Sequence, residues 1–261
     1  MHCTSEKALV YHIETIKKLG FNTMRKHIKI ETARWYYHCD RLGIIVWQDM
    51  VNSGSPYHPL IVTYLPTLFK SLRKRTSDKH HYLLARNDKT NRQEFINECK
   101  ETINYLSHFP CISTWVLFNE GWGQFDTVEL TKYLRTLDPT RLIDSASGWF
   151  DQNCGDFRSE HYYFDKPKII PDKRAFVISE YGGYAYQVKD HVSTNNIYGY
   201  QNYDSKEQFQ KEYQELLNST IFPLIEKGLC GAIYTQLSDI EDEINGLLTY
   251  DREVCKLDID K

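Results

Sequence analysis

The chain lacks the features that mark membrane proteins, secreted proteins and nucleic-acid-binding proteins. No apolar run approaches the roughly 20 residues of a membrane-spanning helix, so we expect no membrane partner. Its 32 basic and 35 acidic residues give a formal charge of −3, which provides no general attraction to nucleic acid. The first residues do not have the architecture of a signal peptide, and we therefore expect the protein in the cytoplasm.

Cysteine pairs and metal-binding motifs are also missing. The seven cysteines are odd in number, and no two of them have C-x-x-C spacing. We expect thiols in a reducing compartment rather than disulfides. No His-x-x-x-His spacing is present, so the sequence predicts neither a metal nor another cofactor. A metal site made from Asp49, Glu120 and Glu180 is the weaker alternative.

What is present is an alternation of helix and strand patterns, which indicates a parallel α/β protein. The 261 residues are close to the roughly 250 of a single (β/α)8 barrel. Thr4 or Ser5 is the predicted N-cap of a first helix that ends at Gly20, and a second helix, 33–42, ends at Gly43. The other predicted helices cover 92–108, 127–137 and 205–227, the last bent near Pro223. The predicted strands cover 21–27, 44–49, 112–118, 141–145, 161–163, 175–179 and 231–235.

This pattern is one strand short of a complete barrel. It begins with a helix where a barrel begins with a strand, so we predict an incomplete (β/α)8 TIM barrel whose first strand is missing. We assign residues 1–261 to one partial catalytic barrel domain. Residues 51–90, which contain three prolines and a basic stretch, are predicted to be a long irregular βα loop insertion. We interpret the basic stretch as a solvated face.

Two short segments carry the chemistry. Residues 115–124 and 177–183 each contain an apolar run that ends in a carboxylate, Glu120 in the first and Glu180 in the second. A barrel delivers its catalytic side chains from the C-terminal ends of its strands. Glycoside hydrolysis needs one carboxylic acid to protonate the leaving oxygen and a second carboxylate to attack the sugar or activate water. Glu120 and Glu180 are therefore the candidate catalytic pair.

Other side chains near strand ends are candidates for substrate binding. Arg25 and His27 are predicted near the top of one strand, with a structural arginine and a core histidine as the alternative. Asp49 ends the next strand, where it can bond sugar hydroxyls or orient a neighbour. Trp122 and Trp149 follow strand ends and could form sugar platforms, with loop packing as the alternative.

Several motifs occur in a specific order along nearly the whole chain. They are Gly20–His27, Val46–Asp49, Phe118–Gln124, His161–Tyr163 and Ser179–Gly183. In this order they resemble the catalytic barrel of glycoside hydrolase family 2, the β-galactosidase and β-glucuronidase family. Residues 234–251 also resemble a β-galactosidase-like branch of that family.

The resemblance implies a retaining exo-β-glycosidase, most consistent with β-galactoside-type substrates, that works by double displacement through a glycosyl-enzyme intermediate. Glu120 falls on the acid/base position and Glu180 on the nucleophile, which implies carboxyl groups about 5–5.5 Å apart. Asn119 matches a residue that bonds the sugar 2-hydroxyl, and Tyr163 matches a tyrosine that contacts the nucleophile. His161 and Tyr234 complete the substrate-binding set implied by the motifs.

Two other functions stay open. One is a catalytically inactive, truncated barrel remnant that binds carbohydrate or associates with another chain. The other is an unrelated barrel lyase or metal hydrolase. The expected partner is a carbohydrate, a homo-oligomer is left open, and galactose, glucuronic acid, mannose and arabinose are not distinguished.

Overall fold

The computed structural model describes residues 6–52, 54–69, 72, 76–193 and 200–258. The chain forms two compact units, Met1–Ser159 and Glu160–Lys261. The predicted N-cap at Thr4 or Ser5, Cys3 and part of the basic stretch lie outside the described residues.

The first unit is built on a parallel sheet. Its strands follow the order β1-β2-β3-β4, with all neighbours parallel. They are β1 (Thr23–Lys26), β2 (Ile45–Asp49), β3 (Ile112–Val116) and β4 (Leu142–Asp144). Because parallel strands end at the same edge, the residues that follow β1, β2, β3 and β4 gather there. All four strands confirm the sequence prediction, with slightly shorter bounds.

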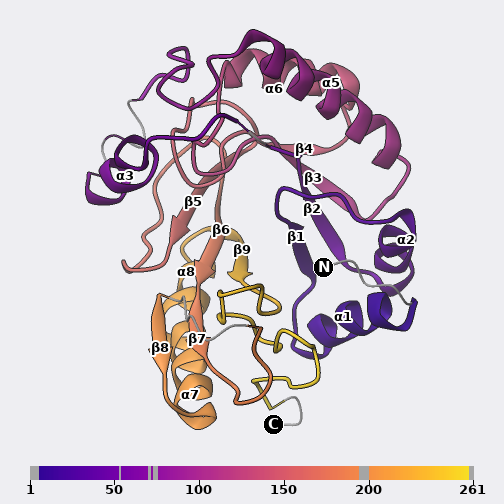
Figure 1. Cartoon of the computed structure of the whole chain (residues 1–261), viewed down its shortest axis with the longest axis vertical. Coiled ribbons are helices and arrows are strands. Elements are labelled where there is room, and N and C mark those ends of the chain that lie inside the picture. The colour runs from indigo at the N-terminus through magenta and orange to yellow at the C-terminus, as the bar shows by residue number, and fades with distance from the viewer. Residues whose placement is uncertain (1–5, 53, 70–71, 73–75, 194–199, 259–261) are drawn as a thin grey trace. The chain divides into compact units, whose positions relative to one another are not determined.

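Amphipathic helices pack beside this sheet. They are α1 (Glu6–Lys18), α2 (Ala33–Leu42), α5 (Lys89–Leu106) and α6 (Thr127–Leu137). In Figure 1, α1 and α2 lie together next to β1 and β2, and α5 and α6 lie together along β3 and β4. The predicted helix end at Gly43 is confirmed: its φ is 70°, and its N–H donates to the carbonyls of Asp40 and Cys39.

The segment 51–90 contains helical turns that the sequence analysis did not predict. They are the π-helical turn η1 (Leu60–Tyr64) and α3 (Leu65–Leu68). Pro59 and Pro66 lie at the starts of these elements, where a missing N–H breaks no helical hydrogen bond. Two of the three prolines that suggested an irregular loop therefore lie at helix starts.

The second unit contains the sheet β5-β6-β9, in which β6 and β9 are parallel. These strands are β5 (Phe157–Tyr162), which crosses from the first unit into the second, β6 (Ala175–Gly182) and β9 (Leu229–Thr235). β6 is longer than predicted, so Glu180 lies within the strand instead of following it.

Two short strands, β7 (Tyr184–Tyr186) and β8 (Gln201–Tyr203), were not predicted. They pair with each other and pack against Phe209 of α7, with the rings of Tyr186 and Tyr203 6.1 and 6.3 Å from it (Figure 1). The predicted long helix is divided into α7 (Lys206–Leu216), the π-helical η2 (Leu217–Ile221) and α8 (Phe222–Ile225). Pro223 cannot donate to a carbonyl in the preceding turn, and the helix changes from π-helical to α-helical geometry beside it, at Phe222. The predicted bend near Pro223 stays a prediction.

Within the described part of the chain, no helix has the length and apolar character needed to cross a membrane. The six described cysteines carry thiols and form no disulfide.

Candidate active site

Arg25 ties together three neighbouring strand ends. Its Nε and Nη2 donate to the two carboxylate oxygens of Asp49, each at 2.8 Å. Nη2 also donates to Oδ1 of Asn119, again at 2.8 Å. The side chains of Arg25 and Asp49 are both only 3% exposed. The guanidinium, which comes from β1, therefore positions Asp49 at the end of β2 and Asn119 in the segment after β3.

Asp49 is fully engaged by protein donors. Besides Arg25, Oδ2 lies 3.2 Å from Nδ1 of His27 and accepts from the N–H of Ile28 at 3.3 Å. Burial alone would raise the pKa of Asp49, but the charge of Arg25 and the hydrogen bonds outweigh it, so the pKa lies below its ordinary value. These contacts give Asp49 the orienting role, and its role toward sugar stays a prediction. They also disfavour Asp49 as a metal ligand.

The orientation of Asn119 follows from the same network. Because Arg25 donates to Oδ1, the carboxamide must direct Nδ2, a donor, away from the guanidinium. The backbone at Asn119 pairs with Ser147, whose N–H donates to the Phe118 carbonyl at 2.9 Å. Strand pairing thus continues past the end of β3 and positions the two residues that precede the candidate acid.

Glu120 lies at a sharp turn of the chain. Its φ is 48°, an uncommon value for a residue with a side chain, and its N–H donates to the Ser147 carbonyl at 3.0 Å. Gly121 follows with φ 76°, and a Cβ there would lie 2.0 Å from the Phe150 ring. The turn therefore requires glycine at position 121, and it places the half-buried carboxylate of Glu120 just beyond a strand end.

The two tryptophans predicted as sugar platforms, Trp122 and Trp149, take part in packing. Trp149 is 9% exposed and belongs to a cluster with Val62, Leu84 and Phe150, against which Trp122 also packs. Trp122 Nε1 donates to the Ser55 carbonyl at 3.3 Å. The alternative of loop packing therefore describes Trp149 best, and a platform role for either residue stays a prediction.

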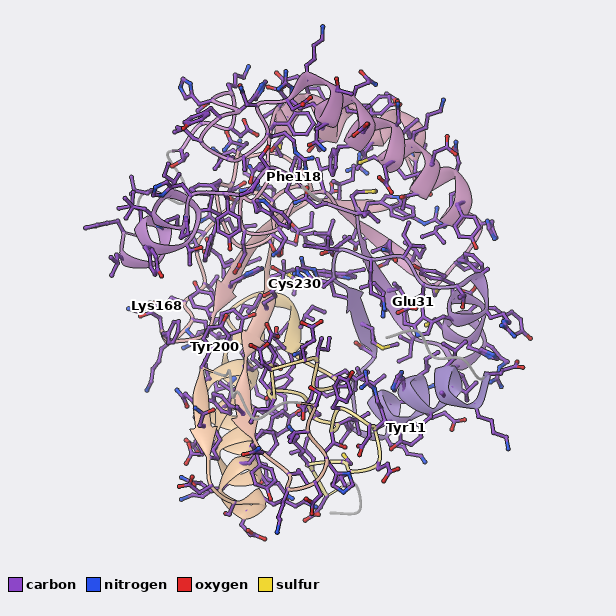
Figure 2. All side chains as sticks on the ribbon, in the orientation of Figure 1. Tyr11, Glu31, Phe118, Lys168, Tyr200 and Cys230 are labelled. Atoms are coloured by element: carbon purple, nitrogen blue, oxygen red, sulfur yellow. The ribbon has the colours of Figure 1, made fainter. Side chains whose placement is uncertain are left out.

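In the second unit, Glu180 lies among polar side chains. The Tyr163 hydroxyl donates to its Oε2, and His161 Nδ1 is 3.5 Å from the same oxygen. The predicted contact between Tyr163 and Glu180 is confirmed. Tyr200, labelled in Figure 2, stacks on Tyr163 with ring centroids 4.1 Å apart. This stacking restricts the orientation of the Tyr163 ring. It therefore holds the hydroxyl that donates to Glu180 in place.

Tyr234 lies apart from this group. Its ring is buried against Tyr181 and Tyr213, at 5.5 and 5.2 Å, and covers Gly182, where a Cβ would lie 2.4 Å from it. Burial raises the pKa of the Tyr234 hydroxyl. The next residue, Thr235, instead lies 3.3 Å from the Tyr163 hydroxyl. Sequence analysis missed Thr235, although the alternation of side chains along a strand places it and Tyr234 on opposite faces.

Two other functional candidates come from the segment 51–90. Asn52 and Arg86 donate to the backbone carbonyls of Trp122 and Gly123, at 2.6 and 2.8 Å. The sequence placed both residues in an irregular insertion, and no local pattern pairs them with the turn at Glu120.

The family model described as glycosyl hydrolases family 2, TIM barrel domain, matches residues 2–226. The chain belongs to glycosyl hydrolase family 2. This membership confirms the predicted fold class, a TIM-barrel domain of the α/β class. Both Glu120 and Glu180 lie inside the matched range, whereas Tyr234 and Thr235 lie beyond it.

The proteins to which this chain is similar differ in the sugars named for them. A β-galactosidase of Halalkalibacterium halodurans is 21% identical over 238 residues, which cover 80% of this chain and 19% of that protein. A family 2 β-galacturonidase of Eisenbergiella tayi bound to galacturonate superposes with TM-score 0.66 at 15% identity, covering 96% of this chain and 45% of that one. A β-glucuronidase of Bifidobacterium dentium complexed with coumarin-3-O-glucuronide gives TM-score 0.66 at 16% identity, covering 97% and 42%. The chain therefore spans less than half of each of these proteins.

Proposed function

We propose that the chain carries the catalytic machinery of a retaining exo-β-glycosidase. The observation that supports this most directly is the hydrogen bond from Tyr163 to Glu180. A nucleophilic carboxylate must be ionised, and donors directed at it stabilise the ionised form. Family 2 membership supports the same chemistry.

In the proposed reaction Glu180 attacks the anomeric carbon while Glu120 protonates the glycosidic oxygen, and the aglycone leaves. The product of this step is a covalent glycosyl-enzyme. Glu120, now ionised, then removes a proton from water, which attacks the anomeric carbon and releases Glu180. Asn119, with its Oδ1 held by Arg25, is oriented to donate from Nδ2 to the sugar 2-hydroxyl. The carboxyl separation of about 5–5.5 Å stays a prediction.

We propose a β-galactoside as the substrate, and the relative from Halalkalibacterium halodurans supports this choice. A β-uronide is the second candidate, because a β-galacturonidase and a β-glucuronidase have similar folds. Galactose and galacturonic acid share their ring configuration and differ at C6, so the decisive comparison is between a neutral and an acidic C6 group.

The test is hydrolysis of nitrophenyl β-glycosides by the purified chain. The panel contains the galactoside, galacturonide, glucuronide, mannoside and arabinoside. Glu180→Gln should lower kcat by about 10⁴-fold or more, the scale seen when a nucleophile is removed. Unchanged hydrolysis in Glu180→Gln would contradict the assignment, loss of activity in a chelator would favour a metal hydrolase, and a folded but inactive chain would favour the inactive remnant.

The retaining mechanism has its own test. A 2-deoxy-2-fluoro glycoside of the preferred sugar, with a dinitrophenolate leaving group, should form a stable adduct. Mass spectrometry should locate that adduct on the peptide that contains Glu180. An inverting enzyme would form no adduct, and NMR would show a first-formed product of opposite anomeric configuration.

A further inference from the structure

Arg86 is a buried cation, and within the described part of the chain its guanidinium donates to neutral oxygens. It is 1% exposed, and among the described residues its hydrogen bonds go to the Gly123 carbonyl at 2.8 Å, to Asn91 Oδ1 at 2.6 Å and to Asn52 Oδ1. The rings of Phe95 and Phe125 lie 4.9 and 5.4 Å from its guanidinium carbon. Burial lowers the pKa of Arg86 to about 10, so it is still charged at neutral pH. Burying a charge is unfavourable unless it is hydrogen-bonded, so the groups that Arg86 binds indicate what the buried arginine does in the structure.

Arg86 and its partner Asn52 bind the backbone that follows Glu120. Arg86 Nε donates to the carbonyl of Gly123, and the Gly123 N–H donates to the Leu84 carbonyl at 2.7 Å. Asn52, held by Arg86 through Oδ1, donates from Nδ2 to the Trp122 carbonyl at 2.6 Å. One guanidinium therefore controls, directly and through Asn52, the carbonyl groups of two consecutive residues.

The turn held in this way is conformationally unusual. Positive φ values occur at Glu120, Gly121 and Gly123, at 48°, 76° and 67°. Sparsely populated backbone conformations persist only where surrounding contacts determine them. Ser147 fixes the start of the turn by accepting from the Glu120 N–H at 3.0 Å. Arg86 supplies the corresponding contacts at its end.

Arg86 also supports the residue that precedes the turn. The Phe95 ring beneath its guanidinium stacks on Phe118, labelled in Figure 2, with centroids 5.1 Å apart and planes 12° apart. The arginine thus contacts Gly123, after Glu120, directly, and it is connected to Phe118, before Asn119, through the Phe95 ring.

We propose that Arg86 is a positioning residue for the general acid: it holds the 121–123 backbone so that the Glu120 carboxyl is directed at the glycosidic oxygen. This inference rests on the proposed role of Glu120. Proton transfer requires hydrogen-bond reach, and a displacement of about 1 Å can lower a rate about 100-fold. Loss of Arg86 should therefore impair the proton-dependent step selectively.

The test compares two leaving groups on the sugar that the chain hydrolyses. Dinitrophenolate leaves without a proton, whereas phenol requires one. In Arg86→Met, we expect kcat/KM for the phenyl glycoside to fall about 100-fold and that for the dinitrophenyl glycoside to fall less than about fivefold. Asn52→Leu should show the same asymmetry with a smaller amplitude.

Two further variants distinguish an error in the proposed function from an error in the positioning role of Arg86. Arg141→Met is the matched control, because Arg141 also donates to backbone carbonyls, but to those of Ser107, before β3, and Ile112, the first residue of β3. It should affect both substrates equally. Glu120→Ala should show the leaving-group asymmetry more strongly than Arg86→Met. If Glu120→Ala lacks it, the proposed function fails; if only Arg86→Met and Asn52→Leu lack it, the positioning role alone is wrong.

Hydrogen exchange provides a readout that does not depend on activity. The Gly123 and Gln124 amides, which donate to Leu84 and Gly121, should exchange about tenfold faster in Arg86→Met than in the unaltered chain. They should be unchanged in Arg141→Met. If Arg86→Met does not fold, Asn52→Leu takes its place in both measurements. Unchanged exchange in a folded variant would overturn the proposal.

Discussion

Arg25 and Asp49 form an ion pair that water scarcely reaches, since both side chains are 3% exposed. Two parallel hydrogen bonds join them, and Arg25 directs Asn119 through a third. A buried pair of this kind is weak evidence for stability in itself, because each charge loses its hydration. Removing one partner is different, because the other charge then stays buried without compensation.

Asp49→Asn is therefore expected to lower the free energy of unfolding by about 3 kcal/mol at pH 7. The folded-state pKa of Asp49 is lowered, so its contribution is complete above the unfolded value of about 3.9 and is lost as pH falls through the folded value. The difference between the two proteins should shrink below about pH 4. Urea unfolding at pH 7 and at pH 3 measures both quantities.

The control for this prediction is Glu129→Gln, which removes an exposed partner of Lys79 in the same unit. Their side chains are 56% and 67% exposed, so the change should be below about 1 kcal/mol. Equal losses for Asp49→Asn and Glu129→Gln would show that burial of the Arg25 pair has no energetic consequence.

At the scale of elements, the turn after β3 depends on glycine for two separable reasons. Gly121 has φ 76° and lies against the Phe150 ring, whereas Gly20, after α1, has φ 87° and nothing within 4 Å of a built Cβ. Gly20→Ala should lose about 1 kcal/mol of stability from backbone strain alone. Gly121→Ala should lose about 3 kcal/mol, because a steric clash is added. Thermal unfolding of the two variants compares them, and equal losses would mean that Phe150 moves aside freely.

Elements defined by local signals were predicted from the sequence. The helix Thr127–Leu137 and the end of α2 at Gly43 follow from amphipathic periodicity and from a residue that tolerates positive φ. The strands β7 and β8 were missed because each has three residues and pairs only with the other, across a long stretch of chain. No local pattern in three residues specifies such a partner.

In the candidate site too, local sequence patterns predict some residues, whereas contacts between distant parts of the chain determine others. Glu120 and Glu180 were predicted because each terminates an apolar run, and the family motifs added Asn119 and Tyr163. The role proposed for Arg86 was not predicted because it depends on packing: its Nε donates to a carbonyl 37 positions later in the chain. Asp49 was found as a strand-end carboxylate, but only the structure shows that its oxygens are already bound by Arg25, His27 and Ile28.

At the scale of the whole molecule, the chain connection between the two compact units is a strand. The boundary at Ser159 and Glu160 lies inside β5, and Arg158 to Glu160 are all buried. Phe157, at the start of β5, stacks on Trp47 of β2 with centroids 5.2 Å apart. Domain boundaries usually lie in exposed linkers, so a buried strand at this position indicates coupled folding.

We therefore expect the two units to unfold in one cooperative transition. Native-state hydrogen exchange over increasing urea should give the same opening free energy for the slowest amides of β3, in the first unit, and of β6, in the second. Phe157→Ala removes the ring that anchors β5 to Trp47, so β3 amides should become less protected, by about 3 kcal/mol if the cavity does not collapse. If unfolding of the two units is coupled, the opening free energy of the β6 amides should fall by the same amount as that of the β3 amides. A loss confined to β3, or different opening free energies in the unaltered chain, would show that the units unfold independently and that β5 connects them without coupling their stabilities.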